Sequence, residues 1–130
     1  MAAGVKRITD YAVFNKEAFT RKRIWETGRL HCNAYAFEPG QQNRMHRHPG
    51  AEEVVFCTEG QGVAVVGVEV IPVRSGDSLV VPADAPHGYL NTSPDQRMVI
   101  VVVQTPLPVE HVAVEPADVA DIVKKAGPTR

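Results

Sequence analysis

Residues 40–60 read GQQNRMHRHPGAEEVVFCTEG, and this stretch decides how the chain folds. In an extended strand, side chains two residues apart lie on the same face, about 7 Å from each other. His46 and His48 therefore point the same way. Pro49-Gly50 is typical of a turn that reverses the chain. The stretch predicts two antiparallel strands joined by a tight turn, with two imidazoles on one face.

The returning strand can bring Glu53 to the same side as the two histidines. Glu52 is the alternative, because only one of two adjacent strand residues can face inward and the other is solvated. His87 is a further candidate, since Pro82 and Pro86 constrain the chain just before it. Imidazole and carboxylate are ligands that transition metals accept. Three imidazoles and one carboxylate would leave two positions of an octahedron open to water or substrate.

The wider pattern predicts an all-β protein. From about residue 28 to residue 104, short runs rich in Val, Phe and Tyr are broken about every 8 to 12 residues by Gly, Pro, Asn or Asp. We expect a short terminal helix over 116–127, after an extended connection over 104–116. NKEAF, residues 15–19, is either a helical turn or an extended arm. The expected strands are 22–27, 30–37, 43–48, 52–58, 61–67, 69–73, 78–82, 86–90 and 97–104.

Composition excludes several classes of function. The chain has 130 residues, with 14 Lys+Arg, 15 Asp+Glu and a formal net charge of -1, so it has no field to attract nucleic acid or an anionic membrane. No apolar run approaches the roughly 18 residues of a membrane span, and the first residues lack the apolar segment of a secretory signal. We therefore expect one cytoplasmic domain. Cys32 and Cys57 are interpreted as small buried hydrophobes, with a metal-proximal or redox role for Cys57 as the alternative.

Two spacings are more specific than any single residue. The first, G-x5-H-x-H-x4-E-x6-G, runs from Gly40 to Gly60, and the second, G-x5-P-x-D-x2-H-x3-N, runs from Gly76 to Asn91. With these two patterns the chain resembles the cupin superfamily, whose first and second motifs they match. One departure is Asp84, where the second motif usually has Gly. Because Asp tolerates the left-handed conformation, we expect the turn to be kept.

The resemblance implies a double-stranded β-helix, or jelly-roll, barrel with a short C-terminal helix. It implies a single cupin domain over 1–130, with motif 1 at 40–60, motif 2 at 76–91, and an extended tail and short helix over 105–130. Cupins of this size are commonly dimers, so a homodimer is expected. The resemblance also implies one divalent transition metal inside the barrel, which is Fe, Mn, Ni, Cu, Co or Zn, with the ligands His46, His48, Glu53 and His87.

Three classes of function fit such a barrel. The first, which we favour, is a metal-dependent enzyme on a small organic molecule, with dioxygenase-like, decarboxylase-like, lyase or isomerase chemistry. The alternatives are a non-catalytic module that binds a small ligand and a purely structural barrel. The acid-base groups available near the motifs are Glu53, a metal-bound hydroxide and Tyr89, so Glu53 and Tyr89 are the candidate catalytic residues.

The ligand expected from this cavity is a small carboxylate, diketone or enol that chelates the metal, because apolar residues supply most of the wall. Around the mouth, the side chains of Gln41, Gln42 and Arg44 either bind an anionic group or are simply solvated. His31 and His111 have no partner at a useful spacing, and we interpret both as ordinary histidines.

Overall fold

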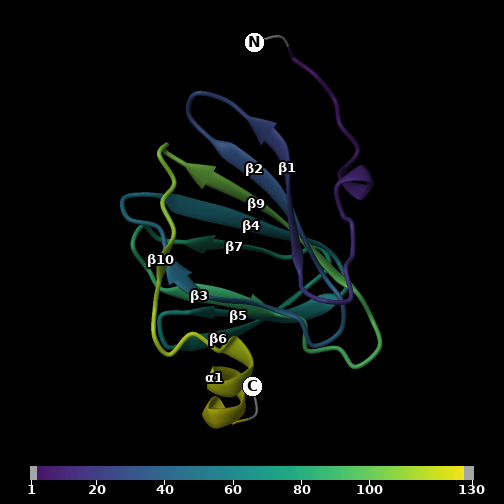
Figure 1. The fold of residues 1–130 in the computed structure, drawn as a ribbon, viewed down its shortest axis with the longest axis vertical. Helices are drawn as coiled ribbons and strands as arrows, with labels where there is room; N and C mark the ends of the chain where they lie inside the picture. Colours follow the sequence, from purple (N-terminus) through teal and green to yellow (C-terminus); the bar gives the residue numbers. More distant parts are fainter. Residues whose placement is uncertain (1–2, 128–130) are drawn as a thin grey trace.

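The computed structural model describes residues 3–127, which form two antiparallel sheets with one α-helix beneath them (Figure 1). This arrangement confirms the predicted all-β jelly roll with a short C-terminal helix. None of the helical segments in residues 3–127 is both long and apolar enough to cross a membrane. The elements are η1 (Ile8–Asp10), β1 (Thr20–Glu26), β2 (His31–Phe37), β3 (Gln42–Arg47), β4 (Glu52–Glu59), β5 (Gln61–Val66), β6 (Glu69–Arg74), β7 (Ser78–Val81), β8 (His87–Leu90), β9 (Met98–Thr105), β10 (Val112–Ala113) and α1 (Val119–Ala126).

Within residues 3–127, each sheet has five strands. The first has the order β1-β2-β9-β4-β7, and the second has the order β10-β3-β8-β5-β6. Consecutive strands therefore often lie in different sheets, as in a jelly roll, and the residues of the two motifs come together only through the crossing connections. β1 and β10 are edge strands, one in each sheet.

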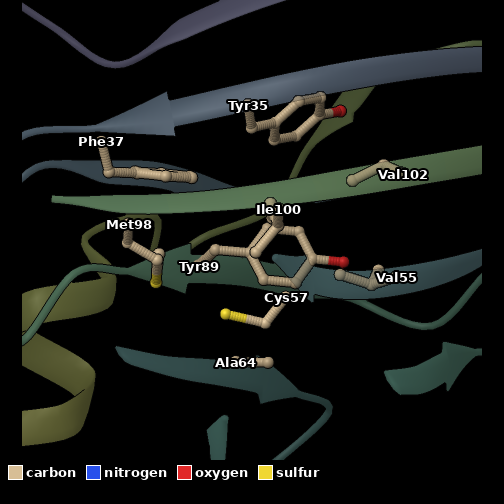
Figure 2. Packing of buried hydrophobic residues seen from close by; sticks show 9 residues of the cluster. All are labelled: Tyr35, Phe37, Val55, Cys57, Ala64, Tyr89, Met98, Ile100 and Val102. Atoms are coloured by element: carbon tan, nitrogen blue, oxygen red, sulfur yellow. The ribbon is translucent and has the colours of Figure 1, made fainter. Parts of the chain in front are cut away.

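The interior between the sheets follows from strand parity. In β4 the burial alternates along the strand, so that Val55 and Cys57 are buried while Val54 and Phe56 face outward. Figure 2 shows the resulting cluster, in which aromatic and aliphatic side chains from both sheets interdigitate. The buried members of the cluster are Tyr35, Phe37, Val55, Cys57, Ala64, Tyr89, Met98, Ile100 and Val102.

The helix α1 covers the outer face of the second sheet. Val119 is fully buried there and packs against Met45, Val65 and their neighbours. The helix begins later than the predicted residue 116, because Asp118 is its N-cap and accepts a hydrogen bond from the Asp121 amide. The side chain of Gln42 accepts a second bond, from the Val119 amide at 2.6 Å. These two acceptors satisfy amides that a helix leaves free at its start.

Other departures from the expected elements are small. Residues 15–19 form no helical turn, with bends at 16–18, and the 3-10 turn η1 lies earlier, at Ile8–Asp10. The extended connection after β9 contains the two-residue strand β10, which pairs with β3. Asp84 has a φ of 69°, which confirms the left-handed turn expected where the motif usually has glycine.

Gly60 is required by both its dihedral angle and its surroundings. Its φ is +74°, and a Cβ added there would lie 2.0 Å from the carbonyl oxygen of Arg97. Gly40 has a similar φ of +81°, but a Cβ added to it would meet nothing within 4 Å. The two glycines of the first motif therefore differ in what a side chain would cost.

We predict that Gly60→Ala lowers the free energy of unfolding by about 3 kcal/mol or more, because strain and a backbone clash add. Gly40→Ala is the matched control and should cost only about 1–2 kcal/mol, from the dihedral strain alone. Urea unfolding of the two variants measures both values. Equal losses of unfolding free energy in the two variants would show that the clash with Arg97 adds no destabilisation.

Candidate metal centre

Three histidines converge inside the barrel. His46 in β3 lies opposite His87, the first residue of β8, and His48 follows immediately after β3 ends. All three are buried, and the potential ligand atoms of the three rings lie within 4.8 Å of one another. His46 and His48 lie on one face as predicted from their spacing, and the pairing of β3 with β8 places His87 of the second motif beside them.

The three imidazoles are held in the same way. The Nδ1 atom of His46 lies 2.7 Å from the carbonyl oxygen of Arg44, and that of His87 lies 3.0 Å from the carbonyl oxygen of Ala85. The Nδ1 atom of His48 is 2.7 Å from the carbonyl oxygen of Glu110. A carbonyl can only accept, so each ring donates from Nδ1, and in the neutral ring the electron pair is then on Nε2. This is the tautomer and orientation of a histidine that binds a metal through Nε2.

Glu53 completes the cluster from the other sheet. Its side chain is 1% exposed, whereas Glu52 is exposed, so Glu53 is the inward member of the pair. One carboxylate oxygen lies 3.2 Å from Nε2 of His48, and the other lies 3.3 Å from Nε2 of His87. Burial by itself would favour the neutral acid, but the neighbouring imidazoles of His48 and His87, together with the Tyr89 hydroxyl, hold the pKa of Glu53 well below its usual value.

Two further side chains fix the orientation of this carboxylate. Gln104, which pairs with Glu53 across β9 and β4, donates an amide hydrogen to it at 3.0 Å. The hydroxyl of Tyr89 donates to its other oxygen. Burial and the negative charge of Glu53 raise the pKa of Tyr89 well above 10, so this hydroxyl stays protonated. The candidate catalytic pair, Glu53 and Tyr89, is therefore in direct contact, and its catalytic role stays a prediction.

The pKa values of His46 and His48 shift in opposite directions. Burial and the nearby His87 lower the pKa of His46 to about 4, so His46 is neutral at pH 7. Although burial works against it, the carboxylate of Glu53 raises the pKa of His48. The Nε2 atoms of His46 and His87 are buried and make no hydrogen bond with the residues described. Electron pairs without a partner, beside a carboxylate, are what a metal ion requires, so three histidines and a glutamate could bind one here.

His111 also lies at this cluster, although its spacing gave no reason to include it. Its ring stacks on His46 at a centroid distance of 5.6 Å and meets His48 edge to face at 4.6 Å. Nε2 of His111 lies 2.9 Å from a guanidinium nitrogen of Arg21, which comes from β1. A cavity of about 390 Å³ reaches His46 and His111 from the surface. Arg21 and His111 were missed because their contact joins residues 90 positions apart.

The other polar residues considered in the sequence have contacts elsewhere. Gln42 binds the start of α1, and Arg44 lies 3.9 Å from Asp118 at the same helix end. Gln41 donates to the carbonyl of Asn15. His31 lies 3.3 Å from Glu26, outside the histidine cluster. Cys57 belongs to the apolar cluster, where its thiol points to the carbonyls of Glu59 and Gly60.

A jelly-roll barrel whose interior holds three histidines and a glutamate from two spaced motifs defines a cupin-type fold with a possible metal site. The comparison with known families agrees, because the family described as "Cupin domain" matches residues 34–104. This chain belongs to the cupin family.

Similar proteins cover most of the chain. The crystal structure of TT1209 from Thermus thermophilus is 32% identical with a TM-score of 0.75, and the match covers 80% of this chain and 98% of that one. A Klebsiella pneumoniae protein with a double-stranded beta-helix domain is 20% identical with a TM-score of 0.80, over 88% of this chain and all of the other, and shares the fold. The "Polyketide synthase CurC" of Streptomyces cyaneus is 28% identical over 89 residues. That match spans 66% of this chain and 58% of CurC.

Two buried tyrosines give a test of the site's hydrogen bonds. We predict that Tyr89→Phe lowers the free energy of unfolding of the metal-free protein by about 1–3 kcal/mol, because it leaves a buried carboxylate short of one donor. The control is Tyr35→Phe, whose hydroxyl is buried without a hydrogen-bond partner among residues 3–127, and this change should cost less than about 0.5 kcal/mol. Thermal and urea unfolding in the presence of a chelator measure both. The reverse order of stabilities would contradict this account of the Glu53 contacts.

Proposed function

We propose that His46, His48, Glu53 and His87 hold one divalent transition metal ion, and that the chain is a metal-dependent enzyme acting on a small organic molecule. The observation that carries this proposal is the common orientation of the histidines, in which a backbone carbonyl accepts from Nδ1 of each ring. Three independent carbonyls that select the same tautomer support a ligand at Nε2 more strongly than proximity alone.

The chemistry belongs to the dioxygenase-like or decarboxylase-like type. A bound metal ion would supply Lewis acidity and open positions for a substrate oxygen. The chain's own residues do the rest. Gln104 and Tyr89 keep both oxygens of Glu53 in place, while Val55, Val102 and Ile100 belong to the same buried apolar cluster as Tyr89. Apolar surroundings that exclude water strengthen the electrostatic contacts of Glu53 with its neighbours.

Proton transfer in this site depends on Glu53. Its carboxylate is ionised, so it can take a proton from a bound substrate, while Tyr89 and Gln104 keep their hydrogen bonds to it. The relative CurC is called a polyketide synthase, which favours a small organic substrate over a macromolecule. The expectations of a homodimer and a cytoplasmic location stay predictions.

The alternative is a cupin that binds a small ligand without turnover. One observation favours it: Tyr89, the second acid-base candidate, is fully engaged with Glu53. The two functions share the metal centre and differ only in whether the bound molecule is changed.

We predict that the purified protein binds about one divalent metal ion per chain. His46→Ala and His87→Ala should each reduce this content to a small fraction, since each removes a buried ligand, and Glu53→Gln should weaken binding while the fold is kept. His31→Ala is the control, because His31 lies outside the cluster and should leave the content unchanged. Mass spectrometry measures the metal content, and circular dichroism tests whether the fold is kept. Full occupancy in the His46 or His87 variant would rule out the assignment.

We also predict turnover by the metal-loaded protein. Oxygen consumption and carbon dioxide release are followed against a panel of diketones, flavonols and small carboxylic acids. A substrate of the proposed enzyme should be consumed by the parent and by the His31→Ala control, and at least about a hundredfold more slowly by His87→Ala. Binding of a panel member with no conversion by the loaded parent would favour the alternative function.

A further inference from the structure

We propose that Arg21 and the hydroxyl of Tyr35 form a subsite for a carboxylate group of the ligand, beside the metal centre. The inference rests on the proposed function, because it names the chemical class of molecule that this centre receives. It assigns a role to two groups that the metal cluster does not use.

The strand register places the two side chains on one face. Arg21 in β1 lies directly opposite Tyr35 in β2. Cross-strand partners in an antiparallel pair project to the same side of the sheet. Tyr35 is 1% exposed and belongs to the interior cluster, so Arg21 also projects toward the interior side, from the exposed edge strand.

The hydroxyl of Tyr35 is a donor without a partner. It is buried, and no described residue accepts a hydrogen bond from it, whereas the donors Arg21 and Gln104 lie near enough to its oxygen to lower its pKa against the larger effect of burial. Figure 2 shows that it points the same way as the hydroxyl of Tyr89, which donates to Glu53. The orphaned donor is therefore aimed toward the end of the barrel that holds the metal centre. A buried hydroxyl without a partner is costly, which points to an acceptor that arrives with a ligand.

The guanidinium of Arg21 carries a charge that no carboxylate balances in residues 3–127. The next inward-facing arginine on the same strand, Arg23, differs because it binds both Glu26 and Asn33. Arg21 instead donates to Nε2 of His111. Since a guanidinium only donates, His111 accepts as a neutral ring and contributes no negative charge.

The contact with His111 also locates Arg21 beside the centre. The ring of His111 packs directly against His46 and His48, so one imidazole separates the guanidinium from the proposed ligands. A divalent ion and Glu53 together carry one positive charge, and Arg21 adds a second. A carboxylate complements this charge, because a guanidinium can give it two hydrogen bonds and the Tyr35 hydroxyl a third. A neutral diketone would leave these donors unpaired.

Ligand binding can be measured directly with cobalt-loaded protein, because its visible spectrum changes when a ligand binds to the ion. The probes are malonate, succinate and glutarate, which place a second carboxylate at increasing distance, and acetohydroxamate, a chelator without a carboxylate. The variants are Arg21→Gln, Arg21→Lys and Tyr35→Phe. Lys22→Gln is the matched control, because it removes the same charge from the next residue, which faces the opposite side of β1.

We expect Arg21→Gln to weaken the binding of the dicarboxylate with the highest affinity by about tenfold or more, because a charged hydrogen bond is lost. Tyr35→Phe should weaken it by a smaller factor, Arg21→Lys should retain part of the affinity, and Lys22→Gln should match the parent. Cobalt content, thermal stability and acetohydroxamate affinity should stay the same in all variants. Dicarboxylate affinities within twofold of the parent in Arg21→Gln, or an equal loss for acetohydroxamate, would overturn the subsite.

Failure of the metal centre can be told apart from failure of the subsite. If the parent binds no cobalt, the proposed function is wrong, and the same dicarboxylates are titrated into the metal-free protein by NMR. Binding that is lost in Arg21→Gln but not in Lys22→Gln would still support the subsite. Equal binding by the parent and Arg21→Gln, or no binding to either, would overturn it as well.

Discussion

The buried carboxylate of Glu53 is the constraint on which the rest of the site depends. An isolated carboxylate is very costly inside an apolar barrel, so donors or positive charge must surround it. The alternation of β4 places this side chain inward, and the neighbouring strands supply what it needs. Gln104 lies opposite in β9, and Tyr89 reaches across from the second sheet. The polar cluster therefore links the two sheets at the same place where the proposed metal ligands converge.

The segment after β9 has a larger part in the site than its extended form suggests. Its short strand β10 pairs with β3, and Ala113 lies opposite His46. This pairing fixes the segment beside the centre, where the Glu110 carbonyl orients His48 and the ring of His111 covers the cluster. A local strand pairing thus provides both an orienting acceptor and the contact to Arg21, which joins the edges of the two sheets.

Most of the fold could be predicted because its signals are local. Alternating apolar residues, turn residues and two regular spacings indicate the strands and the residues that converge, and Asp84 keeps the expected left-handed turn. The remaining features depend on contacts between distant parts of the chain. Gln42 could have been a rim residue, yet it serves the start of α1 because that helix packs against β3. Arg21 and His111 meet only because two edge strands approach each other, and no spacing in the sequence encodes this.

Two tyrosines in one core show how packing and function can be separated. Tyr35 and Tyr89 are both buried, and their rings meet edge to face at 6.4 Å. The hydroxyl of Tyr89 is explained by the structure itself, because Glu53 accepts its hydrogen bond. Phe37, two residues after Tyr35 on the same face of β2, shows that an apolar ring suits this part of the core. Packing therefore accounts for the ring of Tyr35 but not for its oxygen, and a ligand that supplies the missing acceptor, as we propose, would account for the oxygen.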